Sequence, residues 1–206
     1  MEFTFLISAF VTLFVIIDPI GLTPVFLAVT QGMTRTERRV IALRAAAIAI
    51  GLLTLFGLFG EAVLGFVGIT MPAFRIAGGI LLFLTALDML FERRAKRRED
   101  QAEEDRPDPS VFPLATPLIA GPGAMATMIL LTGQAGGGWL ATASVLLVML
   151  AVISVVLSLF LVSSLLEHLL GKTGINVVTR LLGMLLAALS VQFVLDGLKN
   201  VGLAPL

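Results

Sequence analysis

A carboxylate stands inside the first apolar stretch of this 206-residue chain. Asp18 interrupts a run of hydrophobic residues that begins at Phe3. Burying a charged side chain in a hydrocarbon environment is costly, so an intramembrane carboxylate is a functional candidate by default. Two roles are open for Asp18. It could couple an ion or a substrate, or it could cap a helix that restarts after it.

The residues that follow Asp18 disfavour a continuous helix. The segment reads Asp18-Pro19-Ile20-Gly21-Leu22-Thr23-Pro24. Each proline lacks a backbone N–H and disfavours the helical conformation in the residue before it. We therefore predict that the first span is interrupted over residues 18–24.

A second interruption is predicted around Gly121. Pro113 and Pro117 precede the triplet Gly121-Pro122-Gly123. This composition makes a regular helix through Gly121 unfavourable and predicts a half-helix that begins near Gly123. The first N–H groups of such a half-helix lack intrahelical partners and attract an anion. A plain proline kink is the alternative at either position.

The two interruptions together suggest a site for a small zwitterion near the middle of the membrane. The N–H groups at the second break suit a carboxylate, and carbonyl groups with Asp18 or Thr23 at the first break suit an ammonium group. Glycine lets the backbone approach a small ligand closely. The predicted substrate-binding residues are Asp18, Pro19, Gly21, Thr23, Gly121, Gly123 and Ala124.

The composition places these residues in a membrane protein. Hydrophobic residues make up 58% of the chain, charged residues 14%, and the mean hydropathy is +1.04. Soluble domains carry about 25% charged residues. The net charge is zero, which argues against a nucleic-acid partner. The absence of cysteine and the single histidine, His168, argue against disulfides and a multi-histidine metal site. We expect no cofactor.

The hydropathy pattern predicts an all-α membrane protein with six transmembrane helices. A helix needs about 20 apolar residues to cross the roughly 30 Å hydrocarbon core. The predicted spans cover residues 4–30, 40–60, 69–91, 112–133, 139–166 and 175–198. The segment 92–111 is strongly charged and reads as a solvated linker.

The two halves of the chain resemble one another. Residues 61–69 align without a gap on residues 167–175, and residues 75–78 align on residues 180–183 after a one-residue deletion. The linker separates the copies, at 1–91 and 112–206. Because each copy carries three spans, an odd number, the copies must have opposite orientations. Two inverted three-helix repeats with broken first and fourth helices are typical of secondary transporters.

The distribution of lysine and arginine predicts the orientation, because cytoplasmic loops are enriched in these residues. One side carries most of the basic residues, and the other carries Lys199 and at most Arg75. The basic side would be cytoplasmic, with both termini outside the cytoplasm. Its members are Arg35, Arg38, Arg39, Arg93, Arg94, Lys96, Arg97, Arg98, Arg106 and Lys172.

Four segments resemble the MarC family of bacterial inner-membrane proteins. They read DPIGLTPVFL, GITMPAFRIAGGILLF, VFPLATPLIAGPGAMATMI and GINVVTRLLGMLLAALSVQFVLDG, and they cover nearly the whole chain in order. The family pattern has Asn-Pro at the first break, where this chain has Asp18-Pro19. The resemblance implies a six-span protein of the bacterial inner membrane, related to transporters of small neutral amino acids such as glycine and alanine.

Several functions remain open at this stage. The leading hypothesis is a secondary transporter of small neutral amino acids, for uptake or export, that uses alternating access. A proton or sodium gradient, or exchange, would drive it, because the chain has no phosphate-binding loop. The alternative is an exporter or channel-like protein for another small solute on the same fold. An enzyme is disfavoured by the lack of a nucleophile motif, and a scaffold without transport is a further alternative. The oligomeric state stays open.

Overall fold

The computed structural model of this chain describes residues 3–91, 93, 108–136 and 138–201, apart from the side chains of residues 166, 167 and 172. All regular structure in this part is helical, as predicted from the sequence. The helices are α1 (Phe3–Ile17), α2 (Pro19–Val29), α3 (Arg35–Val67), α4 (Met71–Leu90), the π-helical η1 (Ser110–Ile119), α6 (Pro122–Gln134), α7 (Trp139–Leu161) and α8 (Ser163–Asn200).

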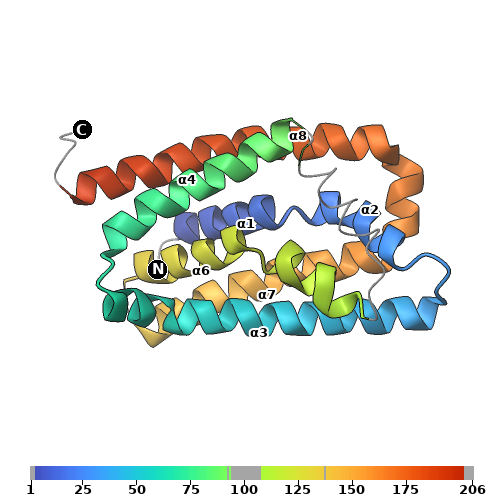
Figure 1. The fold of residues 1–206 in the computed structure, drawn as a ribbon, viewed down its shortest axis with the longest axis horizontal. Coiled ribbons are helices and arrows are strands. Elements are labelled where there is room, and N and C mark those ends of the chain that lie inside the picture. Colours follow the sequence, from blue (N-terminus) through green and yellow to red (C-terminus); the bar gives the residue numbers. More distant parts are fainter. Residues whose placement is uncertain (1–2, 92, 94–107, 137, 202–206) are drawn as a thin grey trace.

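The helices make six passes along the long axis of the molecule. Five of the described helical stretches are long and apolar enough to cross a membrane, and η1 with α6 forms a sixth if this bent pair is one span. Figure 1 shows the start of α1 and the end of α8 toward the same end of the bundle, on the left. The α2–α3 loop and the α7–α8 turn lie at the opposite end (Figure 1). The chain therefore returns to the end at which it started.

The boundaries of two predicted spans were wrong. The second span begins earlier and ends later than predicted, because α3 runs from Arg35 to Val67. Its start is stabilised by a capping box, in which Thr34 and Glu37 satisfy each other's backbone groups. The fifth span ends at Leu161, before the predicted residue 166. A short helical segment follows and turns at Gly171, whose φ of 60° is in the region that favours glycine.

The third and sixth spans, α4 and α8, pack side by side and antiparallel along their length (Figure 1). Gly79 of α4 lies against Ser190 and Val194, near the end of α8, whereas Gly183 of α8 lies against Ala86 near the end of α4. A Cβ atom at Gly79 would come within 2.8 Å of the Ser190 carbonyl oxygen. Small residues therefore allow the two backbones to approach closely, as the sequence predicted.

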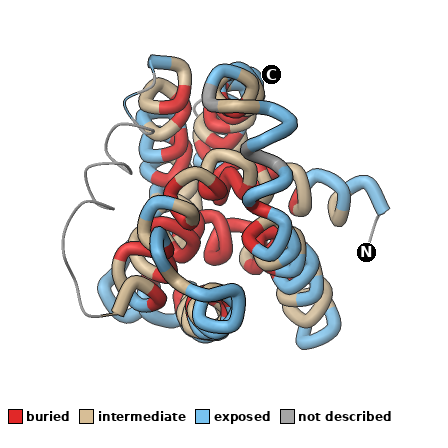
Figure 2. Tube along the Cα trace, turned by 90° about the vertical axis from the view of Figure 1, so that its right-hand side faces the viewer, coloured by how far each residue is buried: buried red, intermediate tan, exposed pale blue. Residues whose placement is uncertain are grey.

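The remaining helices pack around a buried centre. Helix α3 contacts η1, α6 and α7, while α7 also contacts α1 and α2. Figure 2 looks along the bundle and shows buried positions gathered between the helices, with exposed positions on the outside. Many exposed side chains are large and apolar, such as Phe66 at 93% and Leu147 at 66%. Such an apolar outer surface suits contact with lipid.

An ion pair joins the segment just before η1 to helix α3 of the first half. Arg44 of α3 donates to the Asp108 carboxylate at 2.9 Å, and the backbone N–H of Ser110 donates to the same side chain at 3.0 Å. These contacts fix the chain where η1 begins. Most of the predicted linker, residues 92 and 94–107, lies outside the described residues, as do residues 1–2 and 202–206.

Candidate functional site

The first break is a single residue, Asp18. Its backbone is left-handed, with φ 57° and ψ 64°, an uncommon conformation for a residue other than glycine. The Asp18 carboxylate caps α2 by accepting a hydrogen bond from the Gly21 N–H at 3.1 Å. The predicted interruption over 18–24 was too long, because α2 continues through Pro24. Pro19 occupies the first turn of α2, where a missing N–H removes no hydrogen bond.

Asp18 also joins the first half of the protein to the second. The carboxylate is fully buried, and the Thr179 hydroxyl of α8 donates to Asp18 Oδ1 at 3.5 Å. A Cβ atom at Gly21 would overlap Asp18 Oδ2 and would come within 2.9 Å of the Thr179 hydroxyl oxygen. Gly21 therefore leaves the space that this buried carboxylate occupies. Sequence reasoning missed Thr179, because a threonine in an apolar helix most often bonds its own backbone.

Thr23 and Pro19 have structural roles in the described geometry. Both residues are buried, and the Thr23 hydroxyl donates to the Pro19 carbonyl at 3.2 Å, within α2. This hydroxyl compensates locally for the disturbed first turn of the helix. The predicted role of Thr23 as a ligand for an ammonium group stays a prediction.

The second break lies where the sequence predicted it. Phe112 and Thr116, the residues before Pro113 and Pro117, have extended backbones inside η1. The axis bends by 52° between η1 and α6. Helix α6 then begins at Pro122 with Gly121 as its N-cap residue, and no side chain donates or accepts a hydrogen bond at this cap. The first-turn N–H groups of Gly123 and Ala124 precede the intrahelical hydrogen bonds of α6.

Glycines at the second break allow close packing against the first. A Cβ atom at Gly123 would come within 2.9 Å of Ile16 Cδ1, one residue before the end of α1. A Cβ atom at Gly121 would overlap the Pro117 carbonyl oxygen. Ala124 is 3% exposed. The fold thus brings the two breaks together through the Gly123–Ile16 contact, whereas the described side-chain contacts of Asp18 are with Gly21 and Thr179.

The other charged residues differ in their exposure. Glu61 and Arg180 are exposed, and Arg75 is half-buried with its Nε atom buried and without a hydrogen-bond partner among the described residues. The side chain of Glu167 lies outside the described set, so its predicted pairing is untested. Gln192 donates to Asp196 on its own helix at 2.8 Å.

The described residues contain no group of three or more His, Asp or Glu side chains that could hold a metal ion. The chemistry available at the breaks is therefore that of a carboxylate, a few hydroxyl groups and backbone dipoles. This set can bind small polar or zwitterionic molecules, since carboxylates attract cations and helix N-termini attract anions.

Known proteins match this chain over nearly all of its length. The family described as "MarC family integral membrane protein" matches residues 3–201. A UPF0056 membrane protein of Aquifex aeolicus is 40% identical over 200 residues, covering 94% of this chain and 92% of the relative. The UPF0056 membrane protein YvbG of Bacillus subtilis is 37% identical over 206 residues, covering 97% of each chain. No solved structure matches the chain. With its apolar helices, this chain is a multi-pass integral membrane protein that belongs to the MarC family.

Proposed function

We propose that this protein is a secondary transporter of small neutral amino acids, such as glycine or alanine. The observation that carries the proposal is the meeting of two helix breaks inside the bundle. One break holds a fully buried carboxylate, and the other starts a helix whose N-terminus no side chain caps. Such paired breaks supply opposite partial charges at one depth, which a zwitterion requires.

The substrate carboxylate binds at the start of α6, at the N–H groups of Gly123 and Ala124. The dipole of α6 and these N–H groups favour an anion. The substrate ammonium group binds on the side of Asp18. At positions 21, 121 and 123, neighbouring atoms stand so close that an added Cβ atom would meet them. The tight packing at these glycines favours a ligand the size of glycine or alanine over a bulky molecule.

Alternating access between two inverted repeats supplies the transport step. The packing pattern supports this part of the proposal. Helix α3 of the first half packs on α6 of the second, and α7 of the second half packs on α1 of the first. The antiparallel pair of α4 and α8 joins the halves, and each helix brings a glycine, Gly79 or Gly183, close to the other helix. In two related halves, each contact is expected to occur twice in this way.

Asp18 is the candidate for coupling to a proton or sodium gradient. Protonation or ion binding would remove its negative charge and weaken both the cap of α2 and the contact with Thr179 of α8. Because this contact joins the two halves, a change in the charge of Asp18 would bias their relative arrangement. Capping and coupling are therefore compatible roles for one residue.

Uptake into proteoliposomes tests the transport proposal. The purified protein is reconstituted with and without a proton or sodium gradient, and labelled glycine and alanine are added. We expect saturable uptake that is faster when unlabelled amino acid is present inside, since carriers exchange their substrates. Flux without this acceleration would favour the channel-like alternative. Protein-free vesicles and the Gly121→Val variant discussed below are the controls. No amino-acid flux in either mode would contradict the proposal.

The orientation is part of the proposal. The excess of basic residues at the α2–α3 end supports a cytoplasmic position for that end, with the protein in a bacterial inner membrane. Both termini would then lie outside the cytoplasm. Reporter fusions after Leu206 and near Gln101 test this, and a cytoplasmic C-terminus would contradict the orientation.

A further inference from the structure

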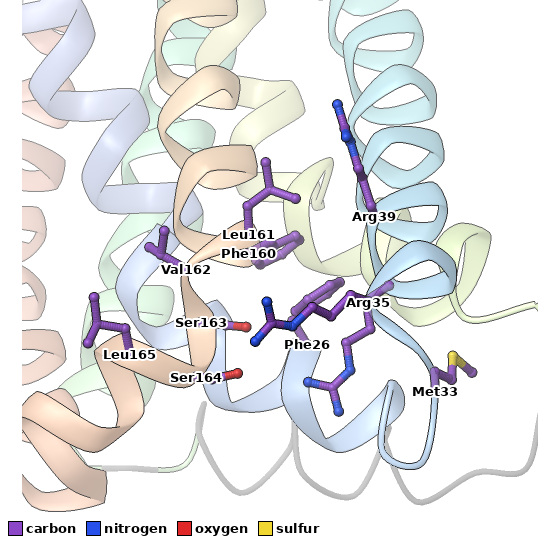
Figure 3. Close-up of a pocket in the computed structure, with 11 residues that line it drawn as sticks. Phe26, Met33, Arg35, Arg39, Phe160, Leu161, Val162, Ser163, Ser164 and Leu165 are labelled. Carbon is purple, nitrogen blue, oxygen red and sulfur yellow. The ribbon is translucent and has the colours of Figure 1, made fainter.

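A basic pocket lies at the end of the bundle where α2, α3 and α7 meet. It has a volume of about 510 Å³ and is separate from the two helix breaks. Arginines of α3 form one wall, and Ser163 and Ser164, just after α7, form another (Figure 3). The floor consists of Phe26 and Phe160, whose rings stack at 4.3 Å between centroids and are almost fully buried.

The charged side chains that line the pocket are all cations. Arg35, Arg38 and Arg39 line it, and no Asp or Glu does so in the part of the chain that the structure describes. The nearby carboxylate of Glu37 is held by the N-cap of α3, where it accepts from the Thr34 N–H at 2.7 Å. Like charges on one wall repel one another, so this wall is stabilised when an anion binds in the pocket.

One hydrogen-bond donor in the pocket is unused. The Nε atom of Arg38 is buried and has no hydrogen-bond partner among the described residues. A buried donor without a partner costs free energy, and a ligand oxygen would remove that cost. Ser163 is 3% exposed, so its hydroxyl offers a second sheltered polar group on the opposite wall.

From this geometry we infer that the pocket is a phosphate-binding site, distinct from the transport site. A phosphate group offers three oxygen atoms to the guanidinium forks and the serine hydroxyls, which a single carboxylate cannot match. The phosphate can come from the headgroup of an anionic lipid or from solution. The inference does not depend on amino-acid transport, since the pocket contains none of the residues at the breaks.

Binding of phosphate compounds to the delipidated protein in detergent tests the site. The probes are phosphatidylglycerol, phosphatidylcholine and inorganic phosphate, measured by native mass spectrometry and by the shift in the unfolding midpoint. We expect Arg35→Gln combined with Arg38→Gln to weaken binding by about tenfold or more, because charge-assisted hydrogen bonds are lost. Arg93→Gln removes a charge outside the pocket and is the matched control. It should leave binding within about twofold.

The outcomes separate the two sources of phosphate. Binding of phosphatidylglycerol but not inorganic phosphate, lost in the double variant, assigns a lipid headgroup. Binding of inorganic phosphate, lost in the same variant, assigns a soluble ligand. If the double variant is not monodisperse, Ser163→Ala with Ser164→Ala keeps the charge and should weaken binding by roughly threefold. The inference would be overturned if the wild-type protein bound neither phosphatidylglycerol nor inorganic phosphate. It would also be overturned if Arg93→Gln weakened binding as much as the double variant.

Discussion

The two helix breaks differ in what caps the helix that begins after each of them. At the first break, the chain supplies its own anion, because the Asp18 carboxylate caps α2. At the second break, the N-cap of α6 is Gly121, which has no side chain to offer. The first N-terminus is therefore closed by the protein, and the second is left for a ligand or water. A zwitterionic substrate requires this asymmetry, since its carboxylate needs an N-terminus that is not already occupied.

The proposed zwitterion site requires different groups at the two breaks. If both breaks carried an aspartate, the carboxylate of a substrate would be repelled at both. If neither did, the ammonium group would have no counter-charge. One acidic break and one glycine break give a site with a positive end and a negative end. Substitutions at four positions test this comparison, from the largest expected effect to the smallest.

The largest effect is expected for Gly121→Val. Its Cβ atom would overlap the Pro117 carbonyl oxygen, a backbone atom that cannot rotate away. Displacing this carbonyl disturbs the start of α6, so we expect amino-acid uptake to fall by about a hundredfold. Gly138→Val is the matched control, because Gly138 is also an uncapped N-cap glycine with extended backbone but has open space at its Cβ position. Equal uptake by the two variants would show that the second break is only a kink.

Two substitutions of Asp18 distinguish its role as the cap of α2 from a role in coupling uptake to an ion gradient. Asp18→Ala removes the cap and leaves alanine in a left-handed conformation, so we expect a loss of about 2 kcal/mol in unfolding free energy and loss of gradient-driven uptake. Asp18→Asn keeps an oxygen for the cap and tolerates this conformation. It should retain stability and exchange but lose the response to the coupling gradient. Gradient-driven uptake by Asp18→Asn at the wild-type rate would show that Asp18 only caps the break.

A smaller effect is expected for Gly21→Ala. The new methyl group would overlap Asp18 Oδ2 and push the carboxylate away from its cap and from Thr179. We expect a loss of about 1 kcal/mol in unfolding free energy, the typical value of an N-cap. Gly51→Ala controls for the change in helix propensity, because nothing lies within 4 Å of its Cβ position. If Gly21→Ala is as stable as Gly51→Ala, the cap contributes little.

The smallest effect is expected for Thr179→Val, which keeps the shape of the side chain but removes its hydroxyl. The hydrogen bond to Asp18 is long, at 3.5 Å, so we expect a loss of about 0.5 kcal/mol in unfolding free energy. If this contact joins the halves during transport, the pH dependence of uptake should shift while the affinity for the substrate stays the same. Unchanged pH dependence would remove Thr179 from the coupling mechanism.

Much of the architecture could be predicted from local sequence. Runs of apolar residues predicted the helical spans, and the Gly121-Pro122-Gly123 triplet predicted the start of α6 to within one residue. Proline restricts the backbone of its own residue and of the one before it, so this preference is local. The same reasoning was wrong at Pro24, where the packing of α2 on α7 and α8 keeps the helix continuous.

Other features depend on contacts between residues far apart in the chain. The hydrogen bond from Thr179 to Asp18 and the pocket of arginines over the Phe26–Phe160 stack have no local signal. The amino-acid sequence by itself determined where the chain is apolar, where helices must break and which side is basic, because each is a property of neighbouring residues. The tertiary structure alone decided that Asp18 is buried against Thr179 and that Gly123 packs on Ile16, because burial and close packing are set by which helices meet.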